Sequence, residues 1–144
     1  MITIIGGKWT TYRKMAQDTL DLAIRYMHIP TKDCITERYQ IHGSRKNPDF
    51  SDPLYVYGTD ADEIRNLVAS SPAMAEKLHP DYAYTVGEVT WLVRNEMPRT
   101  LEDVLARRLR ILFLDARAAM AMAPKVAGIL ATEWGRTRLG PLLR

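Results

Sequence analysis

Two glycines followed by a lysine form the part of this chain best suited to hold an anion. Gly6 and Gly7 follow a short apolar run at residues 2–5, which is typical of a β-strand, and a helical pattern begins at residue 12. A helix that starts directly after such a turn leaves backbone N–H groups without intrahelical partners, with the positive end of the helix dipole behind them. Glycine also lets another molecule approach the backbone closely. By itself, the pair is more typical of an ordinary tight turn than of a binding site.

The longer run around these glycines is more specific. Residues 6–13 read Gly-Gly-Lys-Trp-Thr-Thr-Tyr-Arg, which resembles the end of the flavin domain in the FAD-dependent glycerol-3-phosphate dehydrogenases, a family of respiratory, membrane-associated enzymes. The resemblance covers most of residues 2–135, with a loose match over residues 29–53, and it continues in Tyr57-Gly58, in Gly87-Glu88-Val89 and in the block at residues 96–108. That block resembles the signature of the family's C-terminal helical domain.

The resemblance implies a function for a longer protein. Whole enzymes of the family are oxidoreductases that convert sn-glycerol 3-phosphate to dihydroxyacetone phosphate, with hydride transfer to FAD and electron transfer to a quinone at the membrane. No Gly-x-Gly-x-x-Gly follows an N-terminal strand here, so a binding unit for the FAD adenosine and pyrophosphate is missing. We therefore expect a C-terminal fragment that alone is inactive and does not hold FAD.

The resemblance also implies the partners. They are the remaining FAD and substrate domain of the same enzyme, together with glycerol 3-phosphate and quinone, while a homodimer and a peripheral membrane contact stay open. A hypothesis from another class is a non-catalytic helical protein-interaction module, whose charged faces bind a partner or a second copy. An upstream dinucleotide-binding unit in the gene would favour the first hypothesis over the second.

The candidate site residues follow from the same resemblance. It places the backbone N–H groups of a cofactor-binding turn beside the flavin O2 atom, where reduced flavin carries negative charge; the turn consists of Gly6, Gly7, Lys8, Trp9 and Thr10. Lys8 is also the catalytic candidate, as a point charge that stabilises the reduced flavin or holds the substrate phosphate. The alternative for Lys8 is a solvated lysine.

Charge is distributed unevenly along the chain. The formal net charge is +3 over residues 1–50, −5 over residues 51–98 and +5 over residues 99–144. The arginines of the last segment alternate with leucines at helical spacing, which favours a solvated helix face with internal ion pairs. Because no zinc-finger spacing, RNA-binding motif or terminal basic tract accompanies them, we expect no nucleic-acid partner.

Cysteine content and hydropathy limit the class of protein further. Cys34 is the only cysteine, so the sequence offers neither an intrachain disulfide nor a cysteine-built metal site, and the three histidines lack companion ligands at metal spacing. We therefore expect no metal. A lone thiol fits a reducing cytoplasm, and we expect a cytoplasmic protein, peripheral to the inner membrane in the full enzyme. The longest apolar run is far shorter than the ~20 residues of a spanning helix.

The predicted fold is mainly α, a helical domain of five or six short helices that carries a strand–helix remnant of the flavin domain. We divide the chain into the remnant at residues 1–28, a linker at residues 29–53 and a helical C-terminal domain at residues 54–144. The strand is expected at residues 2–5, and helices are expected at about residues 12–27, 60–69, 72–78, 85–97, 101–112, 115–122 and 124–134.

One acidic residue in the signature block invites two interpretations. Glu88 and Glu96 share a helix face and could serve as paired carboxylates in acid–base chemistry. Alternatively, a tight turn at Pro98 brings Glu96 to Arg107 or Arg108 of the next helix, and the pair is structural. We favour the structural interpretation, because the family places this block away from the flavin.

Overall fold

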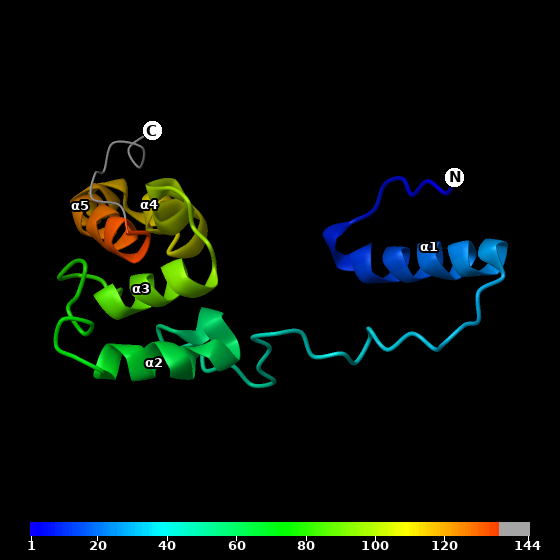
Figure 1. Cartoon of the computed structure of the whole chain (residues 1–144), viewed down its shortest axis with the longest axis horizontal. Coiled ribbons are helices and arrows are strands. Elements are labelled where there is room, and N and C mark those ends of the chain that lie inside the picture. Colours follow the sequence, from blue (N-terminus) through cyan, green and yellow to red (C-terminus); the bar gives the residue numbers. More distant parts are fainter. Residues whose placement is uncertain (136–144) are drawn as a thin grey trace. The chain divides into compact units, whose positions relative to one another are not determined.

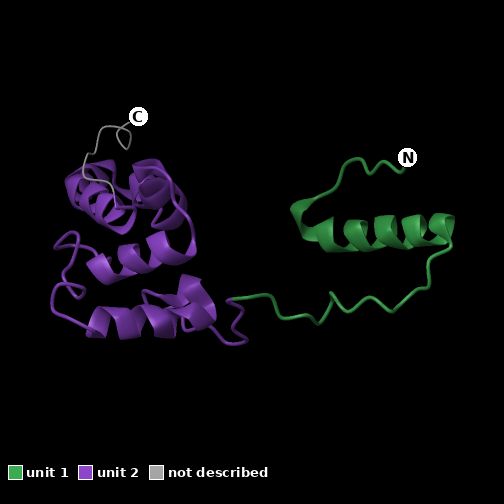
Figure 2. Ribbon diagram, in the orientation of Figure 1, with its two compact units in different colours: residues 1–42 green, residues 43–144 purple. Residues whose placement is uncertain are grey.

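The computed structural model describes residues 1–135 and divides the chain into two compact units (Figure 2). Unit 1 is Met1–His42 and unit 2 is Gly43–Arg144. The mainly α class is confirmed, because helices account for the regular structure of the described residues and no strand forms among them. The division into remnant, linker and helical domain stays a prediction, and the last nine residues of that predicted domain lie outside the described residues.

Unit 1 contains a single long helix. A 3₁₀ turn, η1 (Trp9–Thr11), leads into α1 (Tyr12–Met27), as predicted. At its end His28 adopts a left-handed conformation with φ 52°, and the N–H groups of His28 and Ile29 bond to carbonyl oxygens of the last turn at 3.4 and 3.2 Å. This is a helix-terminating motif that Pro30 then reinforces. The predicted strand at residues 2–5 is wrong: the segment is irregular, because a strand needs a neighbouring strand to complete its hydrogen bonds.

None of the residues of α1 is buried within unit 1. Large apolar side chains such as Tyr12, Leu20, Tyr26 and Met27 are exposed. A helix of this length is marginally stable in water without tertiary packing. We therefore expect the amide hydrogens of α1 to exchange at least ~100-fold faster than those of the buried helices of unit 2 in native-state hydrogen exchange. Equal protection in both would contradict this and would indicate that α1 is covered, for example in a dimer.

Unit 2 holds the hydrophobic core. Its central helix is α3 (Val86–Asn95), which lies between α2 (Ala61–Ala69) and α5 (Ala116–Glu133) (Figure 1). The largest fully buried side chains come from all three helices and their neighbours: Ile64, Leu92, Ile111, Met122 and Leu130. Before α2 runs a 3₁₀ segment, η2 (Tyr55–Asp60). Helix α3 begins where the sequence indicates, since the hydroxyl of Thr85 accepts the backbone N–H of Glu88 at 3.1 Å.

A second helix start in unit 2, near residue 101, is also capped by side chains. The backbone N–H of Asp103 bonds to the hydroxyl of Thr100 at 3.1 Å, and the Asp103 carboxylate accepts the N–H of Thr100 at 3.0 Å and that of Arg99 at 2.8 Å. This arrangement is a capping box. The accepted N–H of Arg99 is the main cause that lowers the pKa of Asp103. A π-helical turn, η3 (Asp103–Arg108), and the short α4 (Ile111–Leu114) follow.

Three predicted helical segments of unit 2 differ in the structure. The helix predicted at residues 101–112 is interrupted, because Arg110 takes a left-handed conformation, with φ 59°, between η3 and α4. Residues 72–75 form only a turn rather than a helix to residue 78, because the carbonyl oxygens of Met74 and Glu76 accept the N–H groups of Gly87 and Val86 instead, at 2.8 and 2.9 Å. The predicted break at Pro124 is also wrong. Helix α5 continues through this exposed proline, since Met122, Val126 and Leu130 pack into the core on both sides of it.

Candidate functional site

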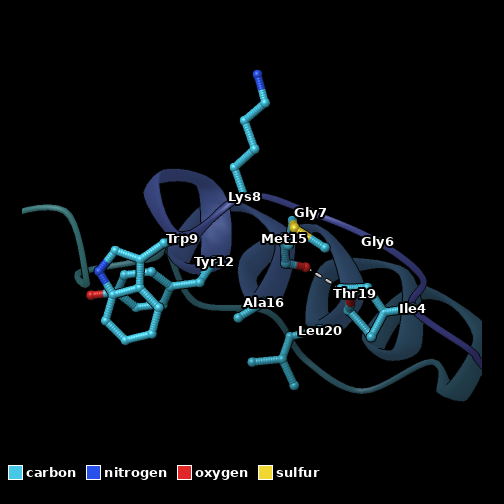
Figure 3. Close-up of a pocket in the computed structure, with 10 residues that line it drawn as sticks. All are labelled: Ile4, Gly6, Gly7, Lys8, Trp9, Tyr12, Met15, Ala16, Thr19 and Leu20. Atoms are coloured by element: carbon cyan, nitrogen blue, oxygen red, sulfur yellow. Dashed lines mark hydrogen bonds between the residues drawn. The ribbon is translucent and has the colours of Figure 1, made fainter.

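The predicted turn lines an open pocket in unit 1 (Figure 3). The pocket has a volume of about 540 Å³ and is bounded by the start of the chain and one face of α1; its walls include Gly6, Gly7, Lys8 and Trp9. Apolar and small side chains of α1 form the rest, among them Met15, Ala16 and Leu20. Thr10 is not among the lining residues. The structure thus brings four of the five predicted residues to one hollow.

Both glycines adopt backbone conformations that other residues rarely take. Gly6 has φ 79° and Gly7 has φ 119°. A Cβ on Gly7 would overlap the end of the flexible Met15 side chain, which would have to move, and the φ of Gly7 would strain any residue with a Cβ. At Gly6 the space is open, with no atom within 4 Å of the position that a Cβ would take. A ligand could therefore approach the backbone of Gly6 closely.

Several backbone N–H groups of the turn are available for a ligand. The N–H of Lys8 bonds to the hydroxyl of Thr11 at 3.2 Å, and the N–H of Thr11 bonds to the carbonyl of Lys8 at 2.9 Å. The N–H groups of Gly7, Trp9 and Thr10 have no hydrogen-bond acceptor within residues 1–135. Donors of this kind at the start of a helix attract negatively charged oxygen atoms.

Lys8 borders this pocket, but its side chain points away from it. Figure 3 shows it extending away from the other labelled side chains, and it is exposed. Trp9 and Tyr12 instead form an aromatic wall, with ring centroids 5.6 Å apart and an angle of 36° between the ring planes. The assignment of Lys8 as a catalytic residue therefore stays a prediction that needs a rotation of its flexible side chain.

The other cations at the start of α1 are paired within unit 1. Arg13 bonds to Gln17 at 3.0 Å and forms an ion pair with Glu37 at 3.3 Å, and Lys14 forms an ion pair with Asp18 at 2.6 Å. These pairs account for cations that oppose the helix dipole without an external anion. They are surface pairs of small energetic value.

Unit 2 contains a buried acid, Glu88, whose burial and hydrogen-bond partner the sequence did not indicate. Glu88 is 4% exposed, and the hydroxyl of Tyr57 donates to its Oε1 atom at 2.7 Å. Burial raises the pKa of Glu88 and also that of Tyr57. Both residues stand in segments that carried the family resemblance, Tyr57-Gly58 and Gly87-Glu88-Val89, but nothing in the sequence showed that these segments meet.

The interpretation of Glu96 as a structural residue is supported by its partner. Its carboxylate pairs with Nε of Arg108 at 3.0 Å, while Arg107 pairs with Asp103 and Glu102 at 3.0 and 2.7 Å. Glu88 bonds to Tyr57 instead, so the two glutamates serve different partners. The geometry offers no shared proton for acid–base chemistry between them.

Neither metal binding nor membrane spanning finds support in the described residues. Within residues 1–135 no cluster of three or more His, Cys, Asp or Glu side chains has the geometry to bind a metal ion. No helix in the same range combines the length and the hydropathy needed to cross a bilayer.

Known proteins that resemble this chain in sequence carry names of glycerol-3-phosphate enzymes. The model of the C-terminal domain of alpha-glycerophosphate oxidase matches residues 2–138. A mitochondrial glycerol-3-phosphate dehydrogenase of Arabidopsis thaliana is 30% identical over 96% of this chain and 27% of its own length. Probable mitochondrial glycerol-3-phosphate dehydrogenases of Caenorhabditis elegans and Dictyostelium discoideum are 33% and 34% identical, over 94% and 96% of this chain and 22% and 24% of their own lengths. The chain spans about a quarter of these relatives. No solved structure matches significantly.

These names correct one expectation. The relatives are named as mitochondrial proteins, so the cytoplasmic location expected from the sequence, with peripheral association at the inner membrane, is contradicted. The physical reason is that Cys34, the only cysteine, indicates at most a reducing environment, which does not identify a compartment.

Proposed function

Because this chain belongs to the family of the C-terminal domain of alpha-glycerophosphate oxidase, we propose that it is the C-terminal part of an FAD-dependent, quinone-linked glycerol-3-phosphate dehydrogenase. In the complete enzyme, sn-glycerol 3-phosphate is oxidised to dihydroxyacetone phosphate. The contribution of this chain to that activity is the turn at residues 6–10, which binds the edge of the flavin, and the helical domain that follows.

The observation that carries the proposal is the set of free backbone donors in this turn. The N–H groups of Gly7, Trp9 and Thr10 lack acceptors in the described chain, and Gly6 leaves the approach to them open. These features fit the electron-rich N1–C2=O edge of a flavin, which needs donors and close backbone approach. When bound, FAD would supply hydride acceptance from the substrate.

The turn and its lysine would have separate tasks. The backbone donors of Gly7, Trp9 and Thr10 would stabilise negative charge on the flavin without any movement of the backbone. Lys8, whose side chain is exposed and flexible, would turn toward the same edge or toward the substrate phosphate as a compact positive charge. The names of the relatives, which are glycerol-3-phosphate dehydrogenases, support this substrate.

The isolated chain is expected to be inactive. Its turn offers donors for one edge of the flavin only, and the sequence lacks the glycine-rich unit that binds the pyrophosphate. Purified chain mixed with FAD and passed through a gel-filtration column should therefore show no flavin absorbance and should not oxidise glycerol 3-phosphate. Flavin that co-elutes at equimolar amount would contradict this prediction.

A chimera tests the proposed function directly. Residues 2–138 of this chain would replace the matching segment of the Arabidopsis relative, and flavin content and glycerol 3-phosphate oxidation would be measured. We expect the chimera to bind flavin and to turn over. In it, Lys8→Met should lower kcat/KM by about tenfold or more, as expected for loss of one stabilising charge, while Lys46→Met, outside the turn, should leave it unchanged.

The results have separate meanings. A folded chimera that binds flavin and reacts equally well with Lys8→Met and Lys46→Met would remove Lys8 from the site but keep the proposed function. A folded chimera without flavin or activity would contradict the function itself, provided that its circular dichroism and melting match those of the parent enzyme.

A further inference from the structure

A pocket in unit 2, far along the sequence from the glycine turn, has a mouth of exposed apolar side chains around an arginine. Its volume is about 400 Å³, within the range of specific binding pockets. The exposed residues that line it include Val56 from η2, Phe113 and Leu114 from α4, and Arg110. We call these four residues the Arg110 surface. The exposed fractions of Val56, Phe113 and Leu114 are 64%, 76% and 73%, so this part of unit 2 leaves much apolar area in water.

The polar groups on the floor of the pocket, its more buried part, already have hydrogen-bond partners within the chain. Glu88 accepts the hydroxyl of Tyr57, and the hydroxyl of Tyr84 donates to the carbonyl of Leu109 at 3.0 Å. Arg108, on the same wall, uses its guanidinium on Glu96 and on the carbonyl of Asp103. These residues therefore do not need a charged group of a ligand as a further partner.

Arg110 differs from these neighbours. It is exposed, and within residues 1–135 it has neither an ion pair nor a side-chain hydrogen bond. Its backbone is held in the left-handed region, with φ 59° and ψ 6°, a conformation that is strained for a residue with a Cβ. Phe113 and Leu114 lie in the short helix that follows, and all three residues line the same pocket.

We propose that the Arg110 surface binds a peptide segment of a partner protein, which places a large apolar side chain in the pocket and a carboxylate against Arg110. The unpaired guanidinium gives the charge complementarity, because arginine binds carboxylates in a bidentate manner. Aromatic residues and arginine are also enriched at the centres of protein interfaces. The partner's carboxylate stays at the mouth, away from Glu88 on the floor.

The apolar area favours a protein segment over a small molecule. It extends past the pocket to Phe50, whose ring packs edge-on against Tyr55 with centroids 5.3 Å apart, and the side chain of Phe50 is also exposed. An extended apolar rim of this kind marks an interaction site for a macromolecule. This inference rests on unit 2 alone and is independent of the proposed flavin contact.

Peptide selection on the full chain tests the proposal. A phage library of random heptapeptides would be selected on the immobilised 144-residue protein, and the affinities of enriched peptides would be measured by fluorescence anisotropy. We expect enriched peptides to carry Asp or Glu within two positions of a large apolar residue. Arg110→Ala and Phe113→Ser should each weaken their binding by about tenfold or more, and Arg110→Lys should retain part of it.

Arg107→Ala is the matched control, because Arg107 is exposed, close in sequence and already paired with acidic residues of its own turn; it should leave peptide binding unchanged. The melting curve of each variant would verify that it folds. Absence of enrichment, peptides without carboxylates, or equal binding to Arg110→Ala would each overturn the proposal. Self-association in sedimentation equilibrium that Arg110→Ala abolishes would also overturn it, in favour of a second copy as the occupant.

Discussion

Gly58→Ala should lower the free energy of unfolding of unit 2 by about 3 kcal/mol or more, the largest effect that we expect from a single methyl group. Gly58 is buried in η2 with φ 55° and ψ −119°, a conformation that residues with a Cβ avoid. The added Cβ would overlap the carbonyl group of Gly43. That carbonyl accepts the N–H of Thr59 at 3.2 Å, so it cannot move away without losing a hydrogen bond.

Gly128→Ala is the control for this prediction. Gly128 is an exposed residue within α5, and no atom lies within 4 Å of the position of an added Cβ. There the same substitution should stabilise the helix by about 0.5–1 kcal/mol. Urea unfolding followed by circular dichroism would measure both. If the two alanine variants had the same midpoint, the backbone conformation assigned to Gly58 would be wrong.

The second large effect is expected from Arg108→Ala, which should lower the free energy of unfolding by about 2 kcal/mol. Arg108 joins the end of α3 to the next turn, through the carboxylate and the carbonyl of Glu96 and the carbonyl of Asp103. Its side chain is 20% exposed and that of Glu96 is 38% exposed. The loss should therefore be smaller than the ~3–5 kcal/mol of a fully buried pair.

Arg107→Ala provides the comparison at the adjacent position. The Arg107 side chain is 56% exposed, and its two ion pairs lie on the surface, so the change should be below about 0.5 kcal/mol. Urea denaturation of both variants in low and high salt measures the difference. Equal destabilisation would mean that Arg108 contributes no more than a surface charge, and the corner would then depend on apolar packing alone.

Helix ends could be predicted where a residue acts on its near neighbours. Thr85 at the start of α3, Thr100 with Asp103, and Pro30 after α1 each indicated a boundary that the structure contains. These signals are local, because a cap bonds to an N–H group three residues away. The predictions failed at residues 72–78 and at Pro124, where distant hydrogen bonds or core packing outweighed the local preference. They failed at residues 2–5 because a strand needs a neighbouring strand, which a local pattern does not supply.

For the candidate site too, local features could be predicted from the sequence and long-range contacts could not. The turn at residues 6–10 could be identified because its glycines, lysine and aromatic residue are contiguous in the sequence. The bond between Tyr57 and Glu88 could not be predicted, since the two residues are 31 positions apart and join η2 to α3 only in the folded unit. That Arg110 has no partner within residues 1–135 could not be predicted either, because several neighbouring arginines have partners and the sequence does not distinguish among them.

Within residues 1–135, three residues other than glycine have a left-handed backbone conformation, and this has an evolutionary consequence. His28, Met97 and Arg110 have φ values of 52°, 48° and 59°, and all three residues are exposed. Glycine would relieve the strain at each of these positions. Substitution by glycine is therefore a way to raise stability that natural selection has not taken. At His28 and Met97, glycine would raise stability without changing the Arg110 surface. At Arg110, glycine would also remove the cation that we propose binds the peptide carboxylate. Selection for thermal stability at this position would therefore weaken the proposed binding.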